Sequence, residues 1–306
     1  MTSPFDSITE RLRLFHSGKA EDRIFARMKV PFPESRWNRL LEKAAEIPLD
    51  PFPPVEPLLP MWEEFLSFSR DIEDDWVPAM YPRRYDQGLY GTLFGAPMQL
   101  DRVDGPGWIC SMTEPLAHPD YPELLRLAAS PKQEWLRHAE ADLRRAAEFA
   151  RGRFGVSVPI TVDALNLAMQ VLGERSLIDI YERPHDLKAL HQAGVKLNIL
   201  VVERLRAAIG AQKEDGVFDF FNAGWMPGQG IPMSVDCYNF CHPQVYAEFG
   251  RPFQQQLIDH FGGGNFHLHG NGRQLLPELA KLSGTVVVIV NNDGSAETAF
   301  DEVRSL

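Results

Sequence analysis

The chain is poor in cysteine and lacks long hydrophobic runs. Its 306 residues include three cysteines, Cys110, Cys237 and Cys241, and an odd, low number does not indicate a disulfide framework. No apolar run approaches the roughly 20 residues that span a bilayer. Residues 1–23 are polar and charged, without the apolar core of a secretory signal. We therefore expect a soluble cytoplasmic protein.

The chain also has fewer basic than acidic residues. Asp and Glu outnumber Lys and Arg by 42 to 31, which gives a net charge of −11. Such a chain lacks the basic surface typical of nucleic-acid-binding proteins and is poorly suited to anionic membranes. We expect a small-molecule substrate, with no nucleic acid and no membrane as partner. The hydrophobic content of 44% is ample for a large core.

The common nucleotide-binding and hydrolase motifs are absent: no G-x-G-x-x-G follows a strand, and there is no P-loop or G-x-S-x-G. Instead, strands alternate with helices in the second half. Strands are expected over 156–162, 216–224, 231–238, 265–270 and 285–293, and helices over 174–209 with a break near Pro184, 243–261 with a kink at Pro252, and 273–282. This alternation indicates parallel βαβ units. We predict one (β/α)8 TIM-barrel domain over residues 1–306, with irregular insertions at about 49–60 and 86–120.

Two histidines share one face of the strand 265–270. His267 and His269 are two residues apart, and side chains alternate along a strand. With a third ligand, two imidazoles can bind zinc; they can also hold or protonate a carboxylated substrate, or be satisfied in a core. All three interpretations stay open. Asp236 or Cys237 is the expected third group, with a buried structural cysteine as the alternative for Cys237.

The turn Gly270-Asn271-Gly272-Arg273 follows the histidines and opens a helix. Free backbone N–H groups at such a turn suit an anionic substrate group, to which Arg273 would add charge. An ordinary tight turn explains the same residues equally well. Trp225, directly after the strand 216–224, is a further candidate substrate contact.

Two other acidic positions are candidate catalytic groups. Asp163 directly follows the strand 156–162, where it either serves catalysis or caps the next helix. Asp75 and its neighbour Asp74 precede another short apolar segment, and are either site acids or surface charges.

Several stretches resemble the uroporphyrinogen decarboxylase superfamily. Residues 153–191 are similar to its central part, including the element Asp179–Pro184, an acid followed by Tyr-x-x-Pro. Residues 233–257 resemble its segment with Ser and Asp, then Pro, then Phe and Pro. Residues 266–284 resemble its next strand, which often reads Tyr-His-Leu-Asp-Gly, and residues 9–24 are similar to its opening helix.

This resemblance implies a TIM barrel and two classes of reaction. One is zinc-dependent methyl transfer between a corrinoid protein and a thiol, with His267, His269 and Cys237 or Asp236 as ligands. The other is cofactor-independent decarboxylation of a tetrapyrrole or aromatic carboxylate, in which Asp75 or Asp163 would stabilise a protonated pyrrole. We expect methyl transfer, with decarboxylation as the alternative. An inactive binding subunit is a third alternative, because Met169 replaces the decarboxylase's tyrosine.

The sequence predicts fewer strands than the eight of a closed barrel. The segment 285–293 is about the sixth strand by comparison with the family, so a closed barrel needs roughly two more βα units. We expect a fragment, missing strands from the N-terminal half, or a second subunit that covers the exposed edge, which would make a homodimer.

Overall fold

The computed structural model describes residues 6–19, 31–49, 52–68, 72, 74–210, 215–221 and 224–291. In the first part, three helices precede a short strand and a 3-10 turn: α1 (Asp6–His16), α2 (Glu34–Ala45), α3 (Leu58–Ser67), β1 (Ala79–Met80) and η1 (Arg83–Tyr85). The continuation of the last expected strand beyond Asn291 lies outside the described residues.

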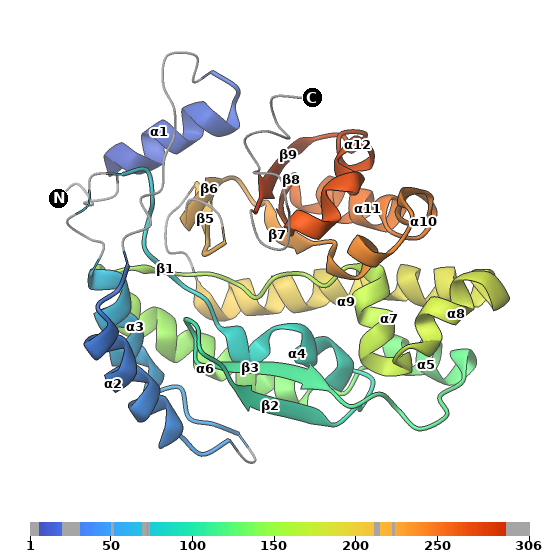
Figure 1. Ribbon diagram of the computed structural model, residues 1–306, viewed down its shortest axis with the longest axis horizontal. Coiled ribbons are helices and arrows are strands. Elements are labelled where there is room, and N and C mark those ends of the chain that lie inside the picture. Colours follow the sequence, from blue (N-terminus) through green and yellow to red (C-terminus); the bar gives the residue numbers. More distant parts are fainter. Residues whose placement is uncertain are drawn as a thin grey trace.

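The middle of the chain is mainly helical. It contains α4 (Gln87–Thr92), β2 (Met98–Arg102), β3 (Ile109–Thr113), α5 (Tyr121–Ala129), α6 (Glu134–Ala150), β4 (Gly155–Val156), α7 (Ala164–Leu172), α8 (Arg175–Glu182) and α9 (Pro184–Ile209). The expected break at Pro184 is confirmed, because α8 ends just before it and the proline occupies the first position of α9. Helix α9 crosses the middle of the molecule, and α6 packs against it (Figure 1).

The last part alternates strands with helices. Its elements are β5 (Gly216–Asp219), β6 (Gly224–Pro227), β7 (Ile231–Ser234), η2 (Asp236–Phe240), α10 (Pro243–Phe249), α11 (Arg251–Phe261), β8 (Gly263–Leu268), η3 (Gly270–Leu275), α12 (Leu276–Leu279) and β9 (Thr285–Val290). The expected interruption of the helix over 243–261 is confirmed, since α10 ends at Phe249 and Pro252 lies in the first turn of α11.

The predicted (β/α)8 barrel is wrong. The described residues form a mixed α/β fold whose sheets have two or three strands, in the orders β1-β4, β2-β3, β5-β6 and β7-β8-β9, and these strands close no barrel. Two of the four sheets are antiparallel hairpins, β2–β3 and β5–β6. Pro159 lies within the strand expected over 156–162, and proline cannot donate to a ladder; only Gly155–Val156 forms a strand there, and Thr161 makes an isolated bridge to Met233.

Residues 86–120 contain regular structure where the sequence indicated an irregular insertion. Helix α4 packs on the β2–β3 hairpin, and Gly91 of α4 lies against Thr113 of β3 so closely that a Cβ at Gly91 would collide with the threonine side chain. The glycine that makes this segment resemble a loop is therefore needed for helix–strand contact.

Parallel pairing brings several strand ends to one edge. β1 pairs with β4, Thr161 bridges to β7, and β7, β8 and β9 pair in that order, all in parallel. The carboxyl ends of these segments therefore point the same way, and loops at such an edge are the usual place for a ligand site in α/β proteins.

Candidate functional site

Four of the residues singled out in the sequence lie at this shared edge. Asp163 follows Thr161 and caps α7, Asp236 begins η2 just after β7, His267 is near the end of β8, and His269 directly follows β8. Three strand ends thus place the four side chains: Asp163 comes from the segment of Thr161, Asp236 from β7 and both histidines from β8.

The two histidines contact each other and a neighbour on each side. Their rings are perpendicular, with centroids 4.6 Å apart. His269 Nε2 lies 3.7 Å from Asp236 Oδ1. The Asn291 side-chain nitrogen lies 3.2 Å from His267 Nδ1, and the Phe221 ring packs on His267 with centroids 5.3 Å apart. Both imidazoles are half-buried, so they are positioned by contacts and still reach solvent.

Asp163 is a buried carboxyl group with two roles open to it. Its Oδ1 accepts a hydrogen bond of 2.8 Å from the Asn166 N–H and caps α7, as one alternative predicted. Its Oδ2 is buried without a hydrogen-bond partner. Burial raises the pKa of Asp163 to about 8; the Asn166 amide acts in the opposite direction, and the charge of Asp236 adds to the increase. Capping therefore leaves one buried oxygen of a protonatable acid without a hydrogen-bond partner.

Asp86 is a site residue that the sequence analysis missed. It follows η1 directly and is half-buried, while its Oδ1 is fully buried and has no hydrogen-bond partner. Burial raises the pKa of Asp86 to about 7; a hydrogen bond from Tyr81 and the charge of Arg83 oppose this increase, and the charge of Asp236 supports it. The feature of the sequence that could have indicated it is an aspartate shortly after the apolar residues 76–81.

The charge of Asp236 connects these acids. It raises the pKa values of both Asp86 and Asp163, so the three carboxyl groups lie in one electrostatic neighbourhood. Two of them exchange protons near neutral pH, where acid–base groups are most effective. The arrangement can therefore hold and transfer protons beside two imidazoles.

In the part of the chain that the structure describes, no three His, Cys, Asp or Glu side chains are grouped to hold a metal ion, and zinc binding stays a prediction. Burial raises the pKa of the Cys237 thiol well above its usual range, and the charges of Asp163 and Asp236 add to this. A cysteine binds zinc as the thiolate, which this environment disfavours.

The turn after the histidines is the 3-10 helix η3. Gly270 is buried, Asn271 is exposed, and Arg273 is buried with its Nη2 donating a hydrogen bond of 2.8 Å to the Asn291 carbonyl. Arg273 thereby ties η3 to the end of β9. It supports Asn291, the residue that contacts His267.

The structure places the two remaining candidates elsewhere. Asp75 precedes β1 and accepts a hydrogen bond of 2.8 Å from Arg11 Nε of α1. Trp225 of β6 is fully buried in the smaller hydrophobic cluster, with Leu12 and Val77 among its members, and Arg13 lies over its ring. These contacts join α1 to the strands.

Comparison with protein-family models and with curated proteins gives no match for this chain. Among the described helices, none combines the length and apolar character needed to cross a membrane.

Proposed function

We propose that the chain is an enzyme that uses Asp86, Asp163 and Asp236 for general acid–base chemistry. The observation that carries the proposal concerns two carboxyl groups, each with one buried oxygen that has no hydrogen-bond partner. Both have raised pKa values under the influence of a third carboxylate beside two histidines. Perturbed acids gathered at a strand edge are typical of catalytic sites.

The reaction that this arrangement supports best is cofactor-independent decarboxylation of an electron-rich aromatic carboxylate, such as a pyrrole. A protonated Asp163 or Asp86 donates its proton to the ring carbon that bears the carboxylate. The negative charge of Asp236 stabilises the resulting ring cation. The bond to the carboxylate then breaks, its electron pair returns to the ring, and CO2 leaves. Water returns a proton to the aspartate, so the net reaction consumes one proton.

Methyl transfer with zinc and a corrinoid protein has less support. It depends on the resemblance to the uroporphyrinogen decarboxylase superfamily, and among the described residues His267, His269 and Cys237 are not grouped to hold a metal ion. The same resemblance includes decarboxylases that need no cofactor, which is consistent with the acids present.

The direct test is product formation from uroporphyrinogen or a simpler pyrrole carboxylate under anaerobic conditions, measured as released CO2 and as the decarboxylated product. We expect Asp86→Asn and Asp163→Asn to lower kcat by roughly a hundredfold or more, the usual contribution of a general acid. Asp186→Asn is the control, because the half-buried Asp186 of α9 pairs with Arg183. No product at high enzyme concentration, or full activity in both site variants, would reject the proposal.

A further inference from the structure

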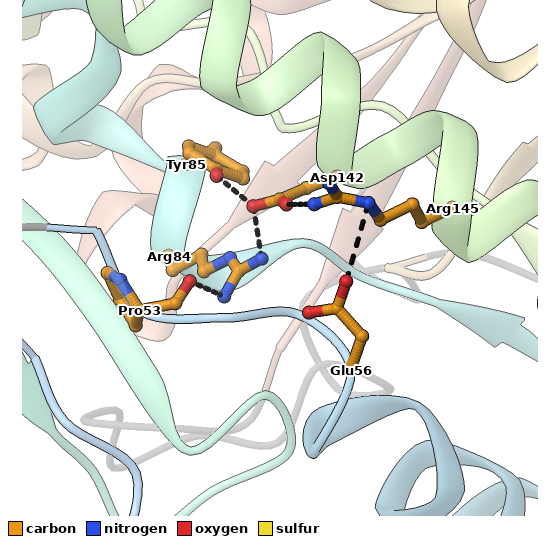
Figure 2. A network of polar contacts seen from close by, with 6 residues as sticks. All are labelled: Pro53, Glu56, Arg84, Tyr85, Asp142 and Arg145. Carbon is orange, nitrogen blue, oxygen red and sulfur yellow. Dashed lines mark hydrogen bonds and ion pairs between the residues drawn. The ribbon is translucent and has the colours of Figure 1, made fainter.

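A buried ion pair anchors the turn that carries Asp86. Asp142 of α6 contacts two consecutive side chains of η1, the Arg84 guanidinium and the Tyr85 hydroxyl, both through Oδ2 (Figure 2). The side chains of Arg84 and Asp142 are 4% and 11% exposed, so this contact is inside the protein. Arg84 Nη1 also donates a hydrogen bond of 2.7 Å to the Pro53 carbonyl.

The second oxygen of Asp142 is also engaged. Arg145 Nη1 lies 3.4 Å from Asp142 Oδ1, and Arg145 Nε lies 3.3 Å from Glu56 Oε1. Figure 2 shows the network joining three parts of the chain: the segment containing Pro53 and Glu56, the turn η1, and helix α6. Asp142 contacts both arginines of the network, Arg84 and Arg145.

The anchored turn ends at Asp86. The Asp86 N–H donates a hydrogen bond of 3.0 Å to the Arg83 carbonyl, which closes the turn, and α4 begins at the next residue. Fixing Arg84 and Tyr85 on α6 therefore fixes the backbone at Asp86. A buried ion pair adds little stability compared with apolar residues of similar size, so its presence at this turn fits a positional role.

We propose that Asp142 is a positioning residue that holds η1 and thereby fixes the position of the Asp86 carboxyl. The catalytic consequence rests on the proposed function, whereas the positional claim is independent of any reaction. Displacement of a reacting group by about 1 Å can cost roughly a hundredfold in rate. If the chain is a decarboxylase, loosening this anchor should lower kcat more than it changes KM.

The test measures Asp86 itself, by NMR titration of protein labelled with 13C at the aspartate carboxyl carbons. The Asp86 signal is the one lost in Asp86→Asn. Asp142→Asn should move its midpoint downward, because a looser turn admits water to the carboxyl. Removal of the Asp142 charge acts in the same direction, so Tyr85→Phe is the decisive variant: it removes one anchor of the turn, leaves the ion pair and changes no charge at neutral pH.

Glu140→Gln is the matched control, because Glu140 is also on α6 but pairs with Arg204. We expect a downward shift of the Asp86 midpoint in Tyr85→Phe, a larger one in Asp142→Asn, and none in Glu140→Gln. An unchanged Asp86 midpoint in folded Tyr85→Phe would overturn the proposal, including when Asp142→Asn fails to fold. If the wild-type protein shows no decarboxylation, the proposed function fails and the titration still decides the role of Asp142.

Discussion

His269 Nε2 lies 3.7 Å from Asp236 Oδ1, and this contact joins residues that follow two neighbouring parallel strands, β7 and β8. The same Asp236 raises the pKa values of Asp86 and Asp163. One carboxylate is thus shared between a histidine pair and two protonatable acids, and this sharing supports the proposal of a single acid–base site at the edge.

The proposed reaction has a defined pH dependence. The general acid must carry its proton, and the pKa values of Asp86 and Asp163 are raised to about 7 and about 8. Activity should therefore be retained at neutral pH and fall by roughly tenfold per pH unit once the pH exceeds the pKa of the acid that donates. A steady-state pH profile of kcat from 5 to 10 measures this, and a rate that rises through pH 8 to 10 would contradict it.

Asp163 should reduce stability as the pH rises. Its folded-state pKa of about 8 exceeds the ordinary value of 3.8, so the folded protein keeps a proton that the unfolded chain has released between these values. The free energy of unfolding should fall with pH across this window. Asp163→Asn keeps an N-cap residue and removes the titration. The difference in free energy of unfolding between the variant and the wild type should change in favour of the variant by up to about 1.4 kcal/mol per pH unit between roughly pH 4 and pH 8.

Urea denaturation at a series of pH values measures that gain. Asp120→Asn is the matched control, because Asp120 is the exposed N-cap of α5 and its side chain accepts a hydrogen bond of 2.7 Å from the Glu123 N–H. It changes a cap without removing a buried acid. A constant difference between Asp163→Asn and the wild type across the window would count against the raised pKa.

The two arginines that contact Asp142 should differ in their effect on stability. Arg84→Met leaves the Asp142 carboxylate buried without its main cation, which typically costs about 3–5 kcal/mol. Arg145→Met removes a side chain that is 55% exposed, and such pairs contribute less than about 1 kcal/mol. Chemical denaturation of both variants measures the difference, and equal losses would show that the Arg84 pair is not the buried anchor.

Two glycines of the β5–β6 region provide a paired test of packing. Gly224 and Gly228 have φ angles of 86° and 74°, a region that favours glycine. A Cβ at Gly228 meets nothing within 4 Å, whereas a Cβ at Gly224 collides with the Val77 carbonyl. Gly228→Ala should cost about 1 kcal/mol from the backbone alone, and Gly224→Ala about 1–3 kcal/mol more. Similar melting temperatures for the two variants would show that the approach to Val77 does not matter.

The strand ends of the site could be predicted because local periodicity locates them. Asp163, Asp236 and His269 each follow a short apolar segment, and parallel pairing brings them to the same edge. Closure of the sheet could not be predicted, because pairing between distant strands is not encoded in local alternation. Pro159 interrupts one expected strand, and β5 turns back as an antiparallel hairpin with β6.

Asp86 and Trp225 were both predicted wrongly from the sequence, the first as no site residue and the second as a site residue. Asp86 was missed because prolines and glycines, which are typical of loops, lie close to it in the sequence. Trp225 was expected near the substrate because it follows a strand, yet the β5–β6 hairpin places it in a core beneath α1. Both outcomes depend on tertiary contacts, with α6 in the first case and with α1 in the second.

The central claim is that Asp86 and Asp163 are protonatable acids of one site. It is tested most directly by titrating the aspartate carboxyl carbons of the wild-type protein by 13C NMR, with Asp86→Asn and Asp163→Asn to assign the two signals. The account predicts midpoints near 7 for Asp86 and near 8 for Asp163, each falling when Asp236→Asn removes the shared charge. Midpoints below about 5 for both groups, within the range of ordinary aspartates, would contradict it.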